Sequence, residues 1–213
     1  MQQYYLEHKE KFQKYMRQYY LKHQAHLCEE SKLEHLSKKR REKYNRPLKN
    51  LVRQMLINYM IAYKIKTVLT LDSEKFDFSN KVPKTKVYVF ENDKRVHDKM
   101  LKRKPNNVKL FFGDIGLYNK QDVDFIYLDF CSSYLTIQGT LKQLKNKIKK
   151  CKLFAITVCP RQHRSQFGDF HIDLIRKIQE ITEVNWKLLY GECYKDQNHT
   201  PMITILFENP INI

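Results

Sequence analysis

Apolar positions in the first 63 residues recur every three to four places, which is the spacing of an amphipathic helix. The stretch up to residue 27 predicts one helix, and residues 29–44 predict a second, strongly basic one. Proline fits the first turn of a helix and disrupts its interior, so Pro47 marks a new helix, which ends near Tyr63. Its apolar face is expected to consist of Leu48, Leu51, Val52, Met55, Leu56, Tyr59 and Met60.

Beyond Tyr63 the pattern changes to short apolar and β-branched runs, which are typical of buried strands. Five such runs occupy residues 66–71, 86–90, 108–112, 124–130 and 153–158. Helical stretches are predicted at residues 93–102, 136–149 and 166–182. Strands that alternate with helices in this way indicate a mostly parallel α/β sheet.

The end of the chain has a different pattern. Residues 186–194 and 201–207 are two strand-like runs separated by a short polar turn, so they are expected to pair antiparallel. The sequence therefore predicts an α/β domain over residues 47–213, whose mostly parallel sheet ends in an antiparallel hairpin. Residues 1–46 are predicted to form a basic helical extension in front of it.

Acidic and polar side chains follow four consecutive predicted strands. In an open α/β sheet, ligands bind outside the carboxyl ends of the strands, where the strand order reverses. We therefore expect these residues to meet at one edge of the sheet. They are Asp72 and Ser73 after the first strand, Glu91, Asn92 and Asp93 after the second, Asp114 after the third, and Asp129 and Phe130 at the fourth.

The order of elements over residues 47–209 and these strand ends resemble class I, Rossmann-like S-adenosylmethionine-dependent methyltransferases. The runs VLTLDS, DFIYLDFCSSY and FAITV are also similar to methyltransferases of large DNA viruses. The resemblance implies S-adenosylmethionine as the cofactor, with Glu91, or Asn92 or Asp93 in its place, on the ribose hydroxyls and Asp114 facing the adenine amine. Asp72 would lie near the methionine part, and Ser73 and Ser79 could belong to a divergent cofactor-binding loop. Asp129 would lie at the transferred methyl or its acceptor, and Phe130 or Tyr134 would stack on a base.

Two departures from the family pattern leave alternatives open. The segment after the first strand, LDSEKFDFSN, has no glycine, whereas most of the superfamily has a glycine-rich turn there. The fourth strand ends in LDFCSSY, without the two prolines usual in enzymes that methylate nucleic-acid amines. The strand-end acids could also be ordinary caps, Phe130 a core residue, and Cys131 a buried thiol rather than a nucleophile. A catalytically inactive fold that binds nucleic acid or a partner protein is therefore the alternative function.

Charge adds a candidate partner. The chain carries a net charge of +17, and residues 1–66 hold 16 Lys and Arg against 6 Glu. Basic segments of this kind bind phosphate backbones, so nucleic acid, DNA or RNA, is the expected acceptor, although a solvated lysine-rich surface is the alternative. The residues expected to contact phosphates are Lys38, Lys39, Arg40, Arg41, Arg161 and Arg164. The apolar stripe of the first helices is a second candidate contact, for a partner protein.

Several other classes of protein are disfavoured by the sequence. No apolar run approaches the roughly 18 residues of a transmembrane helix, and the first residues lack the apolar centre of a signal peptide. The 5 cysteines contain no CxxC pair, and the histidines show no ligand spacing, so we expect no disulfide framework and no metal site. An intracellular location, cytoplasmic or nuclear, is expected, with no membrane partner. The favoured function is a divergent S-adenosylmethionine-dependent methyltransferase acting on nucleic acid.

Overall fold

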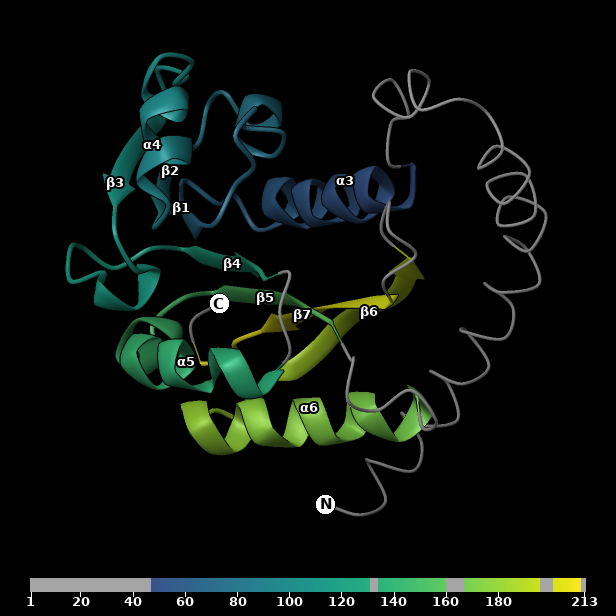
Figure 1. Ribbon diagram of the computed structural model, residues 1–213. Helices are drawn as coiled ribbons and strands as arrows, with labels where there is room; N and C mark the ends of the chain where they lie inside the picture. The colour runs from purple at the N-terminus through teal and green to yellow at the C-terminus, as the bar shows by residue number, and fades with distance from the viewer. Residues whose placement is uncertain (1–46, 131–133, 160–166, 196–200, 212–213) are drawn as a thin grey trace. The chain divides into compact units, whose positions relative to one another are not determined.

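The structure, a computed structural model, describes residues 47–130, 134–159, 167–195 and 201–211 (Figure 1). The chain divides into two units, residues 1–50 and 51–213, and the second unit contains the whole sheet. The predicted extension, residues 1–46, lies outside the described residues. None of the helices in the described ranges is long and apolar enough to cross a membrane.

Seven strands form one sheet in the order β3-β2-β1-β4-β5-β7-β6. Their bounds are β1 Thr67–Thr70, β2 Lys86–Glu91, β3 Val108–Phe112, β4 Phe125–Asp129, β5 Leu153–Val158, β6 Lys187–Lys195 and β7 Pro201–Glu208. The first five strands pair in parallel, whereas β7 pairs antiparallel with both β5 and β6. The predicted α/β class, with a mostly parallel sheet and a terminal antiparallel hairpin, is therefore confirmed.

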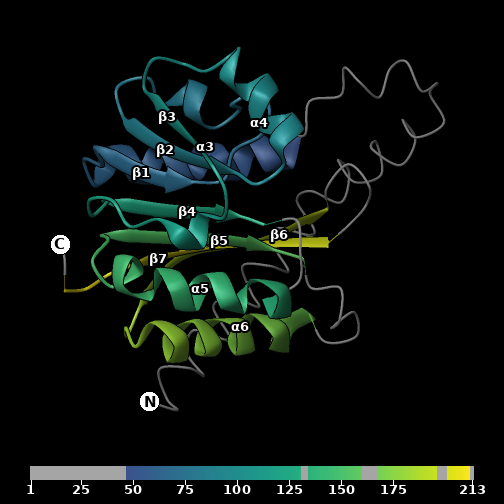
Figure 2. The ribbon, with the colours of Figure 1, turned by 60° about the vertical axis from the view of Figure 1, so that its left-hand side comes forward.

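Helices cover both faces of this sheet. They are α3 Pro47–Ala62, α4 Lys94–Leu101, α5 Tyr134–Ile148 and α6 Phe167–Thr182, with short 3₁₀ helices η1 Ser79–Lys81 and η2 Ile115–Leu117. Both views show α5 and α6 side by side on one face, and α3 and α4 on the other (Figures 1 and 2). The α3 face is packed with a continuous apolar cluster that includes Leu56 and Met60 of α3, Met100 of α4, and Phe125 of β4.

The buried face of α3 differs from the predicted one. Leu51 is 44% exposed, whereas Arg53 and Ile57 are buried together with Leu56 and Met60. Residues 53, 56, 57 and 60 are three or four positions apart and share one face of a helix, while residue 51 points away from it. An arginine therefore occupies a position on this face where the sequence pattern suggested only apolar side chains.

No α-helix lies between β1 and β2, and the sequence analysis predicts none there. The segment is instead a series of turns ending in η1, with Phe76 in the left-handed region at a φ of 55°. Phe76 and Phe78 are buried in the cluster below α3, and the ring of Phe78 lies 5.3 Å from that of Tyr127. Two aromatic side chains thus fill space on this face of the sheet that is otherwise covered by helices.

Candidate functional site

The strand order reverses between β1 and β4, since the chain proceeds outward from β1 through β2 to β3 and then returns to β4. Ligands of open parallel sheets bind at such a point, outside the carboxyl ends of the strands. Four acids occupy these ends: Asp72 after β1, Glu91 at the end of β2, Asp114 after β3, and Asp129 at the end of β4. We call these residues the rim acids.

Of the three polar residues at the end of β2, one caps a helix and two remain accessible to a ligand. Asp93 is the N-cap of α4, and its carboxylate accepts from the backbone N–H groups of Arg95 and Val96 at 2.8 and 3.2 Å. The carboxylate of Glu91 accepts from the backbone N–H of Asp93 at 2.7 Å and is half-buried, while Asn92 is exposed. The capping alternative therefore describes Asp93, whereas Glu91 keeps its second oxygen at the edge of the sheet.

A glycine turn places Asp114 beside Glu91. Gly113 has a φ of 129°, a conformation that favours glycine, and its N–H donates to the carbonyl of Glu91 at 3.0 Å. A Cβ added to Gly113 would meet no atom within 4 Å, so the space next to this turn is open. Asp114 is exposed and is the N-cap of η2, with one oxygen accepting from the N–H of Gly116 at 2.7 Å, so the capping alternative describes this acid as well. Two carboxylates therefore stand at adjacent strand ends.

Asp72 has a different environment. Its carboxylate accepts from the N–H groups of Ser73, Phe78 and Ser79 at 2.7, 3.2 and 2.8 Å and from the hydroxyl of Ser79 at 2.6 Å. The hydroxyl of Ser73 accepts from the N–H of Asp77 at 3.2 Å. These hydrogen bonds join residues within the glycine-free segment between β1 and β2. Contacts from Asp72 or Ser73 to a cofactor remain predictions.

A buried arginine, which the sequence reasoning missed, lies next to the fourth rim acid. The side chain of Arg53 is 4% exposed, with Nη2 3.8 Å from a carboxylate oxygen of Asp129 and Nη1 3.4 Å from one of Asp77. Burial would lower the pKa of Arg53, but the carboxylates of Asp129 and Asp77 raise it above its ordinary value. Its spacing from Leu56, Ile57 and Met60 was the available signal, since a charged residue on the apolar face of a helix usually has a specific partner.

Polar side chains continue from Asp129 along the α3 face of the sheet. The hydroxyl of Thr157 lies 2.7 Å from that of Thr204 and 3.5 Å from that of Tyr127, all in the buried interior. Burial, followed by the charge of Asp129, raises the pKa of Tyr127 well above its usual range. Because Tyr127 then stays a neutral phenol, Arg53 and the carboxylates supply the charge at this end of β4.

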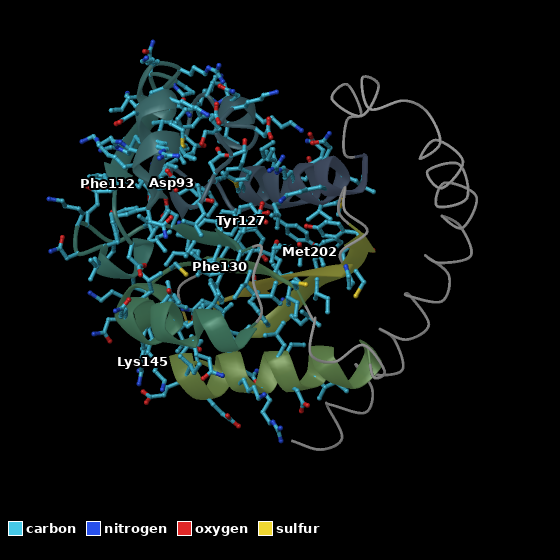
Figure 3. All side chains as sticks on the ribbon, viewed as in Figure 1. Asp93, Phe112, Tyr127, Phe130, Lys145 and Met202 are labelled. Carbon is cyan, nitrogen blue, oxygen red and sulfur yellow. The ribbon has the colours of Figure 1, made fainter. Side chains whose placement is uncertain are left out.

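Phe130, the predicted base-stacking residue, follows β4 directly. Its N–H donates to the carbonyl of Thr157 at 3.0 Å, which extends the pairing of β4 with β5 by one residue. Phe130 and Tyr127 lie between α3 and α5 in Figure 3. The side chain of Phe130 is half-buried, so both alternatives, core packing and stacking on a base, remain open.

The structure does not describe the residues predicted to contact phosphates. Cys131 and the basic residues Lys38, Lys39, Arg40, Arg41, Arg161 and Arg164 lie outside the described residues. Within the described ranges, no group of three or more His, Cys, Asp and Glu side chains could hold a metal ion. Cys151 and Cys193 are buried, and burial raises the pKa of both thiols.

Comparison with protein-family models and with curated proteins finds no match. Among solved structures, the chain is similar to the N-methyltransferase NodS from Bradyrhizobium japonicum WM9, with a TM-score of 0.58 and 11% identity over 77% of this chain and 97% of that one. NodS in complex with S-adenosyl-L-homocysteine matches with a TM-score of 0.55 and 9% identity, over 78% and 89% of the two chains.

An uncharacterised protein from Listeria monocytogenes serotype 4b matches with a TM-score of 0.51 and 11% identity. That match covers 68% of this chain and spans 61% of the Listeria protein. Identities this low establish the fold and not the activity. The likeness to viral enzymes therefore remains a prediction. The sheet order, the terminal hairpin and these matches together show that the chain has the Rossmann-like fold of class I methyltransferases.

Proposed function

We propose that this protein is an S-adenosylmethionine-dependent methyltransferase whose acceptor is a nucleic acid. The observation that carries the proposal is the pairing of Glu91 and Asp114 at adjacent strand ends, linked by the Gly113 N–H bond to the Glu91 carbonyl. Open space beside Gly113 allows a flat group to approach the backbone there. The matched NodS complex with S-adenosyl-L-homocysteine supports a ligand of this class.

The rim residues fit this cofactor chemically. A carboxylate accepts two hydroxyl hydrogen bonds, so the free oxygen of Glu91 suits the ribose diol, and that of Asp114 suits the adenine amine. When bound, S-adenosylmethionine supplies an electrophilic methyl group on a sulfonium. Asp129 would hold the acceptor by accepting a hydrogen bond from one of its N–H or O–H groups. Orientation of the acceptor would then contribute much of the rate enhancement.

A nucleic-acid acceptor is supported by the charge of the chain. The net charge is +17, although the rim acids make the strand ends locally acidic. This combination favours a cationic ligand at the rim and a polyanion on the surface around it. The contacts assigned to the polyanion are the six basic residues named above, from Lys38 to Arg164.

Calorimetric titration with S-adenosylmethionine and S-adenosylhomocysteine tests the enzyme proposal. We expect both ligands to bind, and Glu91→Ala to weaken binding at least about tenfold, because two charge-assisted hydrogen bonds are removed. Glu74→Ala is the matched control, since Glu74 lies on the β1–β2 segment and its ion pairs among the described residues are with the exposed Lys99 and Arg103. Absence of binding by the wild type would contradict the proposal and favour the catalytically inactive fold.

The nucleic-acid proposal has its own test. Changing Lys38, Lys39, Arg40 and Arg41 to Gln in the full chain should reduce the slope of log affinity for duplex DNA against log salt by up to about 3.6, since each phosphate contact contributes about 0.9. The control changes the exposed Lys81, Lys84, Lys102 and Lys109 to Gln, with little change in the slope. Equal slopes for the two variants would show that the basic segment does not contact phosphates.

A further inference from the structure

Arg53 is a buried cation at the point where the strand order reverses. Its side chain extends from α3 toward the ends of β1 and β4 and is 4% exposed. One guanidinium nitrogen donates to Asp77 at 3.4 Å, and another lies 3.8 Å from Asp129, too far for a hydrogen bond. Among the described residues, no acceptor lies within hydrogen-bond distance of the Arg53 Nε.

These contacts leave much of the guanidinium's hydrogen-bonding capacity unused. An arginine presents five N–H donors in a planar fork, and a buried donor without an acceptor is unfavourable because it has lost its water. Asp77 and Asp129 together offset its charge, but of these two only Asp77 accepts a hydrogen bond from it. An arrangement of this kind is suited to receive a further planar acceptor, and a carboxylate matches the fork with two parallel bonds.

The backbone at the end of β1 does not offer unoccupied N–H groups that could bind an anionic group in place of Arg53. In this chain the N–H groups of Ser73, Phe78 and Ser79 already donate to Asp72. An anionic group of a ligand at this strand end would therefore compete with Asp72 for those donors. The guanidinium of Arg53 requires no such exchange.

We propose that Arg53 binds the α-carboxylate of the amino-acid part of S-adenosylmethionine, while Asp77 and Asp129 hold the guanidinium in place. This inference rests on the proposed function and adds a binding residue to it. The charges agree with the assignment: Arg53 with Asp77 and Asp129 carries a net charge of −1, and the cofactor, with one carboxylate, one ammonium and one sulfonium, carries +1.

Two ligands that differ in the amino-acid part distinguish this role. S-adenosylhomocysteine carries the α-carboxylate, whereas 5′-methylthioadenosine has the same adenosine but no amino-acid part. We expect Arg53→Gln to weaken binding of S-adenosylhomocysteine by about 10- to 100-fold in calorimetric titration, the range for a lost charge-assisted bond. Binding of 5′-methylthioadenosine should stay within about twofold of the wild type. Arg95→Gln, on the exposed side of α4, is the matched control and should change neither affinity.

A double variant keeps the test decisive if the single one loses its fold. Arg53→Gln leaves Asp129 buried without its cation, which is destabilising, whereas Arg53→Gln combined with Asp129→Asn removes both charges. The same selective loss is expected in both. The assignment of Arg53 would be overturned, with the proposed function left standing, by any of three results. These are equal losses for the two ligands, loss of 5′-methylthioadenosine binding in both variants, or unchanged affinities. Failure of the wild type to bind either ligand would instead contradict the proposed function.

Discussion

Substituting Asp72 tests whether this carboxylate organises the segment after β1. It accepts four hydrogen bonds, two of them from Ser79, which is fully buried. Asp72→Ala leaves the N–H and the hydroxyl of Ser79 without an acceptor, at about 1–3 kcal/mol each, and removes the bonds to Ser73 and Phe78 as well. Since those two N–H groups can recover part of the loss with water, we expect a total destabilisation of about 3–5 kcal/mol.

Asp72→Asn should have a smaller effect, because its amide keeps one accepting oxygen. That oxygen can still serve the N–H groups of Ser73 and Phe78, which both donate to Oδ1. The amide nitrogen can donate to the Ser79 hydroxyl but faces the Ser79 N–H as a second donor. One buried donor is therefore left unsatisfied, and we expect a loss of about 1–3 kcal/mol.

Urea denaturation at neutral pH measures both changes as shifts of the midpoint at an unchanged slope. Glu74→Ala, on the same segment, is the control, because surface ion pairs such as those of Glu74 contribute at most about 1 kcal/mol. If Asp72→Ala stayed within about 0.5 kcal/mol of the wild type, the carboxylate would not be what holds the segment together. The order Ala, then Asn, then wild type in increasing stability is the expected signature.

Two further predictions concern the backbone and a titrating group. Both Gly113 and Gly139 have room for a Cβ, so their replacement by alanine differs only in the backbone. Gly113→Ala should destabilise the fold by about 1–3 kcal/mol because an alanine is strained at a φ of 129°, whereas Gly139→Ala on the exposed side of α5 should stabilise it by about 0.5–1 kcal/mol. Thermal denaturation showing the same sign for both would refute this. Burial and the 2.5 Å hydrogen bond to Glu208 raise the pKa of Tyr63 to about 12. The neutral phenol therefore contributes stability below pH ~10 that is lost as the pH rises through about 12. Tyr63→Phe should flatten this alkaline loss in urea denaturation measured from pH 9 to 12, and an unchanged pH profile would contradict the assignment.

Within the described residues, the hydrophobic pattern was sufficient to locate the main strands and helices. The run at residues 153–158 became β5 Leu153–Val158, and the run at 108–112 became β3 Val108–Phe112. Local periodicity carries this information because a strand or helix buries side chains at a fixed repeat. The parallel class followed from the alternation of strands with helices.

The position of β7 depended on the tertiary structure. The turn between the last two strands predicts only that β7 lies beside β6, and the structure inserts β7 between β5 and β6. Nearly every residue of β7 is buried, as expected for a strand with neighbours on both sides. The partner of a strand across a sheet is remote in sequence, so no local pattern specifies it.

The candidate site shows the same division. Sequence placed the acids Asp72, Glu91, Asp93 and Asp114 after their strands, because strand ends can be counted along the chain. It could not distinguish Asp93, which caps a helix, from Glu91, whose second oxygen stays at the edge of the sheet.

Arg53 illustrates what only the fold decided. Its sequence neighbours indicate a helix, but the two acids that balance its charge lie 24 and 76 positions further along the chain, at Asp77 and Asp129. Composition and periodicity specified the helices, the strands and the excess of positive charge. The tertiary structure decided which carboxylates retain accepting oxygens and which cation reaches them. These contacts depend on the packing of α3 against the sheet, because hydrogen bonds and ion pairs between distant segments exist only after that packing forms.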